Sequence, residues 1–273
     1  MVKVKFFLLF FLASCYNISA SKVDTLLVES KSMQKTIKNI VILPDAYENE
    51  NQQFPVLYLL HGAGGNHLDW ISNVPELKNY ADDYSVIIVC PDAAKTSWYF
   101  DSPVDDSMRY ETYISSELVK TIDTIYSTFR KKNKRAITGL SMGGHGALYL
   151  ALKHQDIWGA AGSMSGGVDF RPFPENWDIK KRLGEYEKNK EAWDKNTVIN
   201  LTYLYEGDLK LIIDCGYNDF FFDVNKRLHE KLNQEKINHD YIERPGAHNW
   251  HYWSNAVKYH FLFFNDFFNA TKN

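Results

Sequence analysis

The stretch Gly139-Leu140-Ser141-Met142-Gly143-Gly144 decides how the rest of the chain is interpreted. The β-prone run Ala136-Ile137-Thr138 precedes it, and an Ala/Leu-rich segment that extends to Leu150 follows it. A serine between two glycines at a strand-to-helix turn is typical of a nucleophile elbow, because this turn is too tight for bulky side chains two residues before and after the serine. The alternative is an ordinary glycine-rich turn. Only the rest of the sequence can distinguish these two interpretations.

The composition favours one large core and argues against a surface that binds polyanions. With 273 residues, of which 45% are hydrophobic, the chain is long enough to bury one large core, and we expect a single domain over residues 21–273. The formal net charge of -3 and the absence of a Lys/Arg block argue against nucleic acid as a partner. The sequence does not indicate an oligomeric state.

The first 20 residues have the pattern of a signal peptide. Two lysines precede the apolar run Phe6 to Ala13, which is too short to span a bilayer as a folded helix. We therefore expect export to the periplasm or the medium and no membrane span. Cleavage after Ala20 and lipoprotein-type cleavage before Cys15, which would leave a lipid anchor in the outer membrane, both fit the sequence.

Apolar runs alternate with helical patterns along the chain, which predicts a mostly parallel sheet with helices on both faces. The predicted strands are 23–28, 40–43, 54–60, 85–90, 136–138, 159–163, 210–215 and 240–243, and helical spacing is found at 76–83, 110–129 and 250–268. The stretch Val168 to Asp208 is irregular, and we expect it to form an insertion over one end of the sheet. Ligands of such sheets bind beyond the carboxyl ends of the strands.

A catalytic serine needs a base and an acid partner, and the chain offers both in a suitable order. Ser141 is followed by Asp219 and then by His248, the order of elbow-type hydrolases. Asp219 is preferred to Asp214 because Asp214 lies inside a predicted strand, and His248 is preferred to His251, which falls one helical turn further on. The remaining candidates, His145, His154, His229, His239 and His260, are interpreted as structural.

An oxyanion that forms next to Ser141 needs two amide donors. The Met142 N–H is one candidate, and Ala63 in His61-Gly62-Ala63-Gly64-Gly65 is the other, because its glycine neighbours let N–H groups turn inward. No Lys-Ser/Thr pair follows this loop, as a phosphate-binding P-loop requires. His61 and His67 do not have the spacing of metal ligands, so neither a metal nor a cofactor is expected.

Four segments in register resemble one branch of the α/β hydrolases. They are Leu59 to Gly65, Gly139 to Gly144, Cys215 to Asp219 and Gly246 to Trp250. The branch is the esterase D-like one, with feruloyl esterases of the carbohydrate esterase family 1 type, tributyrin esterases, S-formylglutathione hydrolases and mycolyltransferases. From about Val23 onward, the resemblance implies an eight-stranded sheet of order 1-2-4-3-5-6-7-8. It also implies a triad of Ser141, Asp219 and His248, with Ala63 and Met142 as oxyanion donors.

The resemblance, together with the expected export, implies a serine carboxylesterase for feruloyl or acetyl esters on plant polysaccharides such as arabinoxylan. Trp98, Tyr99, Asp101 and Trp177 are candidate substrate contacts, although for each aromatic residue taken alone packing in the core or the lid is the favoured interpretation. The alternatives are an S-formylglutathione hydrolase, a tributyrin-type short-chain esterase, acyl transfer to a sugar, and a non-catalytic carbohydrate-binding protein on the same scaffold.

Cys90 and Cys215 lie at the ends of two predicted strands. These strands are several positions apart in the expected order, and at about 4.8 Å per strand their separation exceeds the roughly 7 Å that a disulfide can bridge. We expect two free, buried thiols.

Overall fold

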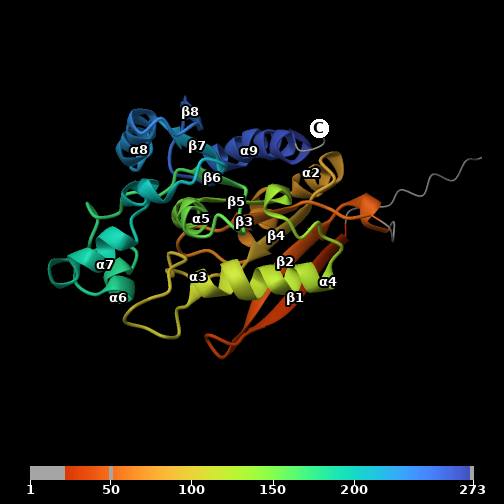
Figure 1. Cartoon of the computed structure of the whole chain (residues 1–273), viewed down its shortest axis with the longest axis horizontal. Coiled ribbons are helices and arrows are strands. Elements are labelled where there is room, and N and C mark those ends of the chain that lie inside the picture. Colours follow the sequence, from red (N-terminus) through yellow and green to blue (C-terminus); the bar gives the residue numbers. More distant parts are fainter. Residues whose placement is uncertain (1–21, 49–51, 271–273) are drawn as a thin grey trace, which may run out of the picture.

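An eight-stranded sheet forms the centre of the computed structural model, which describes residues 22–48 and 52–270 (Figure 1). The strands are β1 Lys22–Ser30, β2 Lys35–Leu43, β3 Val56–Leu60, β4 Ile87–Pro91, β5 Arg135–Leu140, β6 Ala160–Met164, β7 Lys210–Gly216 and β8 Asp240–Arg244. The expected signal segment, including Cys15, lies outside the described residues.

The helices lie around this sheet. They are α1 Asp69–Asn73, α2 Leu77–Asp83, α3 Tyr110–Thr112, α4 Val119–Ile125, α5 Met142–Lys153, α6 Ile179–Leu183, α7 Lys190–Lys195, α8 Phe222–Gln234 and α9 Trp250–Ala270. Short 3-10 turns occur at Asp45–Glu48, Lys132–Lys134, Tyr186–Lys188, Val198–Asn200 and Thr202–Leu204. None of these helices in the described residues has the length and apolar character needed to cross a bilayer.

The strand order is β1-β2-β4-β3-β5-β6-β7-β8, which confirms the order that the family resemblance implies. β2 pairs antiparallel with β1 and with β4, whereas every neighbouring pair from β4 to β8 is parallel. The parallel strands therefore end at one edge of the sheet. The loops after β3, β5, β7 and β8 meet at this edge, where ligands of such folds bind.

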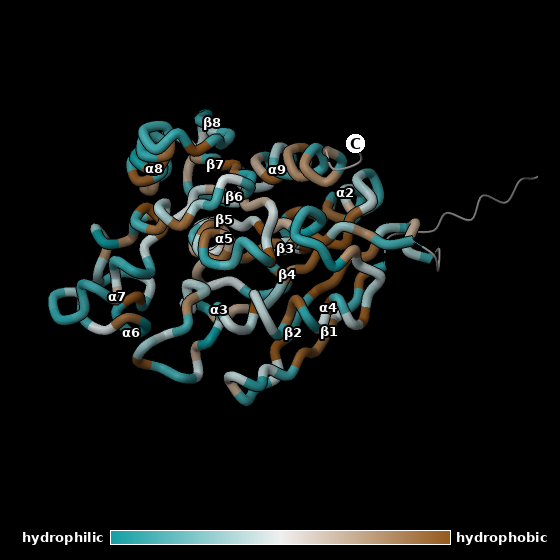
Figure 2. The backbone as a smooth tube through the Cα atoms, in the orientation of Figure 1, coloured by the Kyte–Doolittle hydropathy of each residue, from teal (hydrophilic) through white to brown (hydrophobic). Residues whose placement is uncertain are grey.

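The sheet divides the core into two layers, because successive side chains of a strand point to opposite faces. In β3, Val56 and Tyr58 belong to one apolar cluster and Leu57 and Leu59 to the other. The first cluster is covered by α4, α5, α8 and the segment 168–208, and the second by α1, α2 and α9. Figure 2 shows the apolar strands at the centre and hydrophilic backbone at the periphery, for example along α7.

Two of the predicted elements differ from the structure by several residues at one end. β2 begins at Lys35 rather than residue 40, because residues 35–43 pair along their whole length with β1 in a hairpin. The predicted helix 110–129 ends at Ile125 and passes through a π-helical stretch, Tyr113–Leu118. After it the chain is extended, and the Phe129 N–H donates to the Phe54 carbonyl at 3.2 Å.

The segment 168–208, expected to be irregular, folds into short helices at the end of the molecule where Figure 1 shows α6 and α7. This segment is anchored to α5, since the Asn196 carbonyl lies 2.8 Å from Nε2 of His145 on that helix. Trp193 is fully buried and its indole N–H donates to the Gly184 carbonyl at 2.9 Å. Trp193 is therefore the central buried side chain of this segment.

The two cysteines of the described residues are free and buried, as predicted. Cys90 lies on β4 and Cys215 on β7, and β3, β5 and β6 separate these strands.

Candidate active site

Ser141 lies at the turn between β5 and α5 in a strained conformation. Its φ of 55° and ψ of -117° are sparsely populated for a residue with a side chain. A Cβ at Gly143 would lie 2.5 Å from the Leu60 carbonyl oxygen, and one at Gly139 would lie 2.7 Å from the Gly143 carbonyl carbon. The two glycines therefore let β3, β5 and α5 approach closely enough for the elbow to form.

Ser141, His248 and Asp219 form one hydrogen-bonded chain. His248 Nε2 lies 2.9 Å from Ser141 Oγ, and His248 Nδ1 lies 3.0 and 2.9 Å from the two carboxylate oxygens of Asp219. The carboxylate favours the tautomer with the proton on Nδ1, which leaves Nε2 able to accept the serine proton. The loops after β5, β7 and β8 thus bring together three residues that are far apart in the sequence.

The Asp219 carboxylate is held by the backbone as well as by the imidazole. Its side chain has no exposed surface, and Oδ1 accepts a hydrogen bond from the Phe221 N–H at 2.8 Å. The loops that carry the acid and the histidine are tied together, because the Asn218 N–H donates to the Gly246 carbonyl at 2.8 Å. The carboxylate is fixed in the position that it needs to orient His248.

The rival acid, Asp214, has different partners. It is fully buried on β7 and accepts hydrogen bonds from the Tyr252 hydroxyl and the Arg244 guanidinium. Burial raises the pKa of Asp214 to about 6, although Tyr252 and Arg244 counteract the rise. Among the described residues, Asp214 forms neither a hydrogen bond nor an ion pair with His248. His251, the rival base, is exposed on α9.

The two predicted oxyanion donors lie beside the serine. Met142 is the first residue of α5, so its N–H has no partner within the helix. The Ala63 N–H makes no hydrogen bond within the part of the chain that the structure describes, and Ala63 is partly exposed. A Cβ on the preceding Gly62 would come within 3.4 Å of Ser141 Cβ. The loop after β3 therefore reaches the elbow.

His61 fixes this loop, a role that the sequence analysis missed. Its Nε2 accepts a hydrogen bond from the Ala93 N–H at 3.0 Å, so its Nδ1 carries the proton and donates to the Gly62 carbonyl at 2.8 Å. Burial lowers the pKa of His61, which keeps the ring neutral. The signal available in the sequence was a histidine directly after a fully apolar strand, where a buried polar side chain needs partners.

Comparison with known proteins assigns the family. Residues 30–261 match the family model described as "Putative esterase". The chain belongs to this esterase family. It is 25% identical over 248 residues to an acetyl esterase of Caldicellulosiruptor saccharolyticus. The aligned region covers 84% of this chain and 92% of that protein.

Solved structures of other enzymes have the same fold. A ferulic acid esterase superposes with a TM-score of 0.80 at 27% identity and covers 92% of this esterase and 99% of its own chain. An S-formylglutathione hydrolase of Staphylococcus aureus gives 0.79 at 20% identity, with coverage of 90% and 100%. These likenesses and the sheet order confirm the α/β-hydrolase fold.

Two of the four candidate substrate contacts are packed in the core, as the alternative interpretation of these aromatic residues expects. Trp98 and Tyr99 are 1% and 0% exposed, because left-handed backbone conformations, with φ of 55° and 62°, turn both into the core. The Tyr99 hydroxyl donates to the His61 carbonyl at 3.0 Å, and the Trp98 indole N–H donates to the Trp177 carbonyl at 3.2 Å. Both side chains therefore hold neighbouring loop segments in place through these hydrogen bonds, and neither has accessible surface that a substrate could contact.

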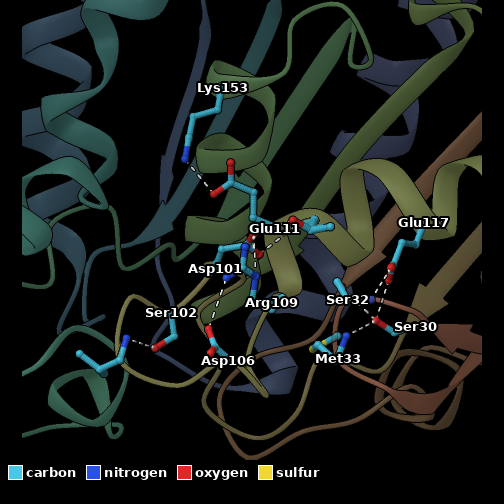
Figure 3. Close-up of polar contacts among 12 residues, drawn as sticks. Ser30, Ser32, Met33, Asp101, Ser102, Asp106, Arg109, Glu111, Glu117 and Lys153 are labelled. Carbon is cyan, nitrogen blue, oxygen red and sulfur yellow. Dashed lines mark hydrogen bonds and ion pairs between the residues drawn. The ribbon is translucent and has the colours of Figure 1, made fainter.

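Asp101 is also engaged elsewhere. It accepts hydrogen bonds from the Thr112 N–H at 3.0 Å and hydroxyl at 2.5 Å and forms an ion pair with Arg109 at 3.5 Å (Figure 3). Together with Glu111 and Lys153 it lines a polar cavity of about 700 Å³, and no residue of the hydrogen-bonded chain at Ser141 lines that cavity. Trp177 is the one candidate of the four that is both partly exposed and close to His248, because its ring stacks on Phe220, which in turn packs on His248.

The described residues contain no group of three or more His, Cys, Asp or Glu side chains arranged to hold a metal ion. His67 Nδ1 instead lies 3.2 Å from an Asp92 carboxylate oxygen.

Proposed function

We propose that this esterase is a serine carboxylesterase in which Ser141 is the nucleophile, His248 the general base and Asp219 the residue that orients it. The observation that carries the proposal is the continuous hydrogen-bonded chain from Asp219 through His248 to Ser141, with contacts of 2.9 to 3.0 Å. The strained turn at Ser141 supports it, because such strain persists where the surrounding structure maintains it.

In the first half of the reaction, Ser141 Oγ attacks the acyl carbon while its proton moves to His248 Nε2. The carbonyl oxygen becomes an oxyanion, which the Ala63 and Met142 N–H groups stabilise. The ester C–O bond then breaks, and His248 returns the proton to the departing alcohol oxygen. The acyl group remains on Ser141.

The second half repeats these steps with water. His248 Nε2 takes a proton from a water molecule whose oxygen attacks the acyl carbon, and the same two N–H groups stabilise the second oxyanion. The bond to Ser141 Oγ breaks and the serine recovers its proton from His248. The net reaction is ester plus water to carboxylic acid plus alcohol, without a cofactor.

For the substrate, we propose feruloyl or acetyl esters on plant polysaccharides such as arabinoxylan. The likenesses to an acetyl esterase and to a ferulic acid esterase support this class. S-formylglutathione or a short-chain glyceride is the second candidate, and the fold of the S-formylglutathione hydrolase neighbour is compatible with it. A non-catalytic carbohydrate-binding protein is the alternative in another class.

We further propose that the protein is exported. The apolar run Phe6 to Ala13 and the two possible cleavage positions, after Ala20 and before Cys15, support this proposal. The mass of the mature N-terminal peptide distinguishes the two routes, because lipoprotein processing leaves an acylated Cys15. An intact N-terminus on the protein recovered from cells would contradict export.

Hydrolysis of p-nitrophenyl acetate by the wild-type protein and by Ser141→Ala tests the catalytic proposal. Loss of the nucleophile should reduce kcat by about 10⁴-fold or more, whereas equal rates would contradict the proposal and favour the binding protein. A panel of methyl ferulate, acetylated xylan, tributyrin and S-formylglutathione then identifies the acyl group. A preference for S-formylglutathione over both polysaccharide-type esters would overturn the proposed substrate class.

A further inference from the structure

A half-exposed aromatic side chain lies directly against the imidazole of the active site. Phe220 follows Asp219 in the loop after β7 and is 51% exposed. Its ring centroid lies 4.1 Å from that of His248, with the ring planes tilted by 38°. A large apolar side chain that remains in water does not gain the stabilisation that its burial would provide, and the proposed chemistry does not use this ring.

Trp177 extends this apolar surface. Its ring stacks on Phe220 with centroids 5.7 Å apart and planes 18° apart, although the two residues belong to different loops. Two contacts hold Trp177 in place. Its ring packs on that of Phe221 with centroids 5.2 Å apart, and its carbonyl accepts a hydrogen bond from the Trp98 indole N–H. The two stacked rings, Phe220 and Trp177, form what we call the aromatic shelf.

We propose that the aromatic shelf is the binding site for the alcohol part of the ester and that it takes a sugar ring. This inference rests on the serine esterase function proposed above. His248 Nε2 must come within about 3 Å of the departing alcohol oxygen to protonate it. The carbon skeleton attached to that oxygen therefore starts beside the imidazole against which Phe220 packs.

The carbonyl oxygen is directed elsewhere, toward the Ala63 and Met142 N–H groups on the loop after β3 and on α5. The acyl chain and the alcohol leave the tetrahedral carbon in different directions. The shelf on the His248 side is thus placed to distinguish alcohols and not acyl groups.

The chemistry of the shelf selects a sugar. A pyranose ring presents C–H groups on its faces and hydroxyl groups around its edge, so it can cover an aromatic ring and keep its hydroxyls in water. Phe220 is open to solvent, which suits a sugar ring that continues into a polymer. A small alcohol such as methanol covers little of this surface.

The test varies one side of the ester at a time. Methyl acetate and a methyl xyloside monoacetate share the acyl group and differ in the alcohol, whereas methyl acetate and methyl ferulate share the alcohol. In Phe220→Ala, we expect kcat/KM for the xyloside acetate to fall about tenfold relative to methyl acetate, mainly through KM, as when an aromatic anchor is truncated. The ratio between methyl ferulate and methyl acetate should stay as in the wild type.

Tyr217→Ala is the matched control. Tyr217 lies in the same loop and is 50% exposed, but its ring packs on Phe222 and not on His248. It should leave both ratios unchanged, and Phe220→Trp should restore the preference for the sugar ester. A fall in both acetates by the same factor in Phe220→Ala, or a change in the ferulate ratio instead, would overturn the inference.

A binding measurement separates this inference from the proposed function. Xylotriose contains no ester, and its affinity for wild type and Phe220→Ala can be measured by calorimetry at high ligand concentration. If the wild type hydrolysed none of the esters but bound xylotriose through Phe220, the esterase function would fail and the sugar site would stand. If xylotriose did not bind, or bound both proteins equally, the sugar site would be refuted whatever the activity.

Discussion

Asp214 and Asp219 are two buried carboxylates only five positions apart, and their contacts give them different roles. We expect Asp219→Asn to lower kcat by a factor on the order of 10³ to 10⁴, because an amide favours the wrong tautomer of His248. The melting temperature should change little, since the side-chain oxygen of the introduced amide can still accept the Phe221 N–H. Initial rates on p-nitrophenyl acetate and a thermal melt measure both effects.

Asp214→Asn is the companion variant. It removes the charge that faces Arg244 in a buried site, so the melting temperature should fall while kcat stays within about tenfold of the wild type. The opposite result, a 10³-fold loss of activity in Asp214→Asn with an active Asp219→Asn, would show that Asp214 is the acid.

At this scale the sequence predicts some residues well and others poorly. Ser141, Asp219 and His248 could be found because the turn and the chain order constrain them, and the structure brings all three together. Trp98 and Tyr99 could not be placed, since their inward direction depends on left-handed backbone angles at two residues with side chains. Tryptophan and tyrosine, unlike glycine or asparagine, do not indicate such angles in a sequence.

Among the elements, α3 is tied to the C-terminal end of α5 by one carboxylate. Glu111 on α3 accepts hydrogen bonds from the Tyr149 hydroxyl at 2.5 Å, Lys153 Nζ at 2.8 Å and His154 Nε2 at 2.9 Å, and Figure 3 shows its contact with Lys153. Burial alone would raise the pKa of Glu111, but these hydrogen bonds lower it to about 2. This carboxylate therefore anchors the helix that begins at Ser141.

This anchor predicts a pH-dependent stability. Because the pKa of Glu111 is lower in the folded protein than its ordinary value of 4.5, its contribution is present above pH 4.5 and is lost as the pH falls toward 2. The shift corresponds to about 3 kcal/mol. The difference in unfolding free energy between wild type and Glu111→Gln should therefore shrink between pH 5 and pH 2, as measured by urea denaturation.

Glu191→Gln is the control for this measurement. Glu191 pairs with Lys195 on the surface of α7, and exposed pairs of this kind contribute little. A pH-independent difference for Glu111→Gln, equal to that of Glu191→Gln, would contradict the anchoring role.

The elements also show where local patterns stop being informative. The core helices and strands can be predicted because their apolar periodicity reflects two buried layers. The short helices of segment 168–208 cannot, since each has only five or six residues and depends on contacts such as the one between His145 and Asn196. The predicted helix extends too far because the apolar Phe129 fits the helical spacing. In the structure the Phe129 N–H instead donates to the Phe54 carbonyl, beyond the end of α4.

For the whole molecule, the sheet order followed from the family resemblance and not from periodicity, which is the same for any arrangement of apolar strands. That order places the loops after β3, β5, β7 and β8 on one edge. It thereby explains why Ala63, Ser141, Asp219 and His248 meet although up to 185 positions separate them in the sequence. The same order also determines which side chains can never meet.

Cys90 and Cys215 are the pair that this topology keeps apart. Four strand spacings separate β4 from β7, about 19 Å at 4.8 Å each, against the roughly 7 Å that a disulfide can bridge. Burial raises the pKa of both thiols and shields them from reagents. In a chain that starts at residue 21, we expect no reaction with a thiol reagent in the native state and two reactive thiols after unfolding, with or without prior reduction. Cys215→Ser should lower that number to one, and two thiols that appeared only after reduction would contradict the strand order.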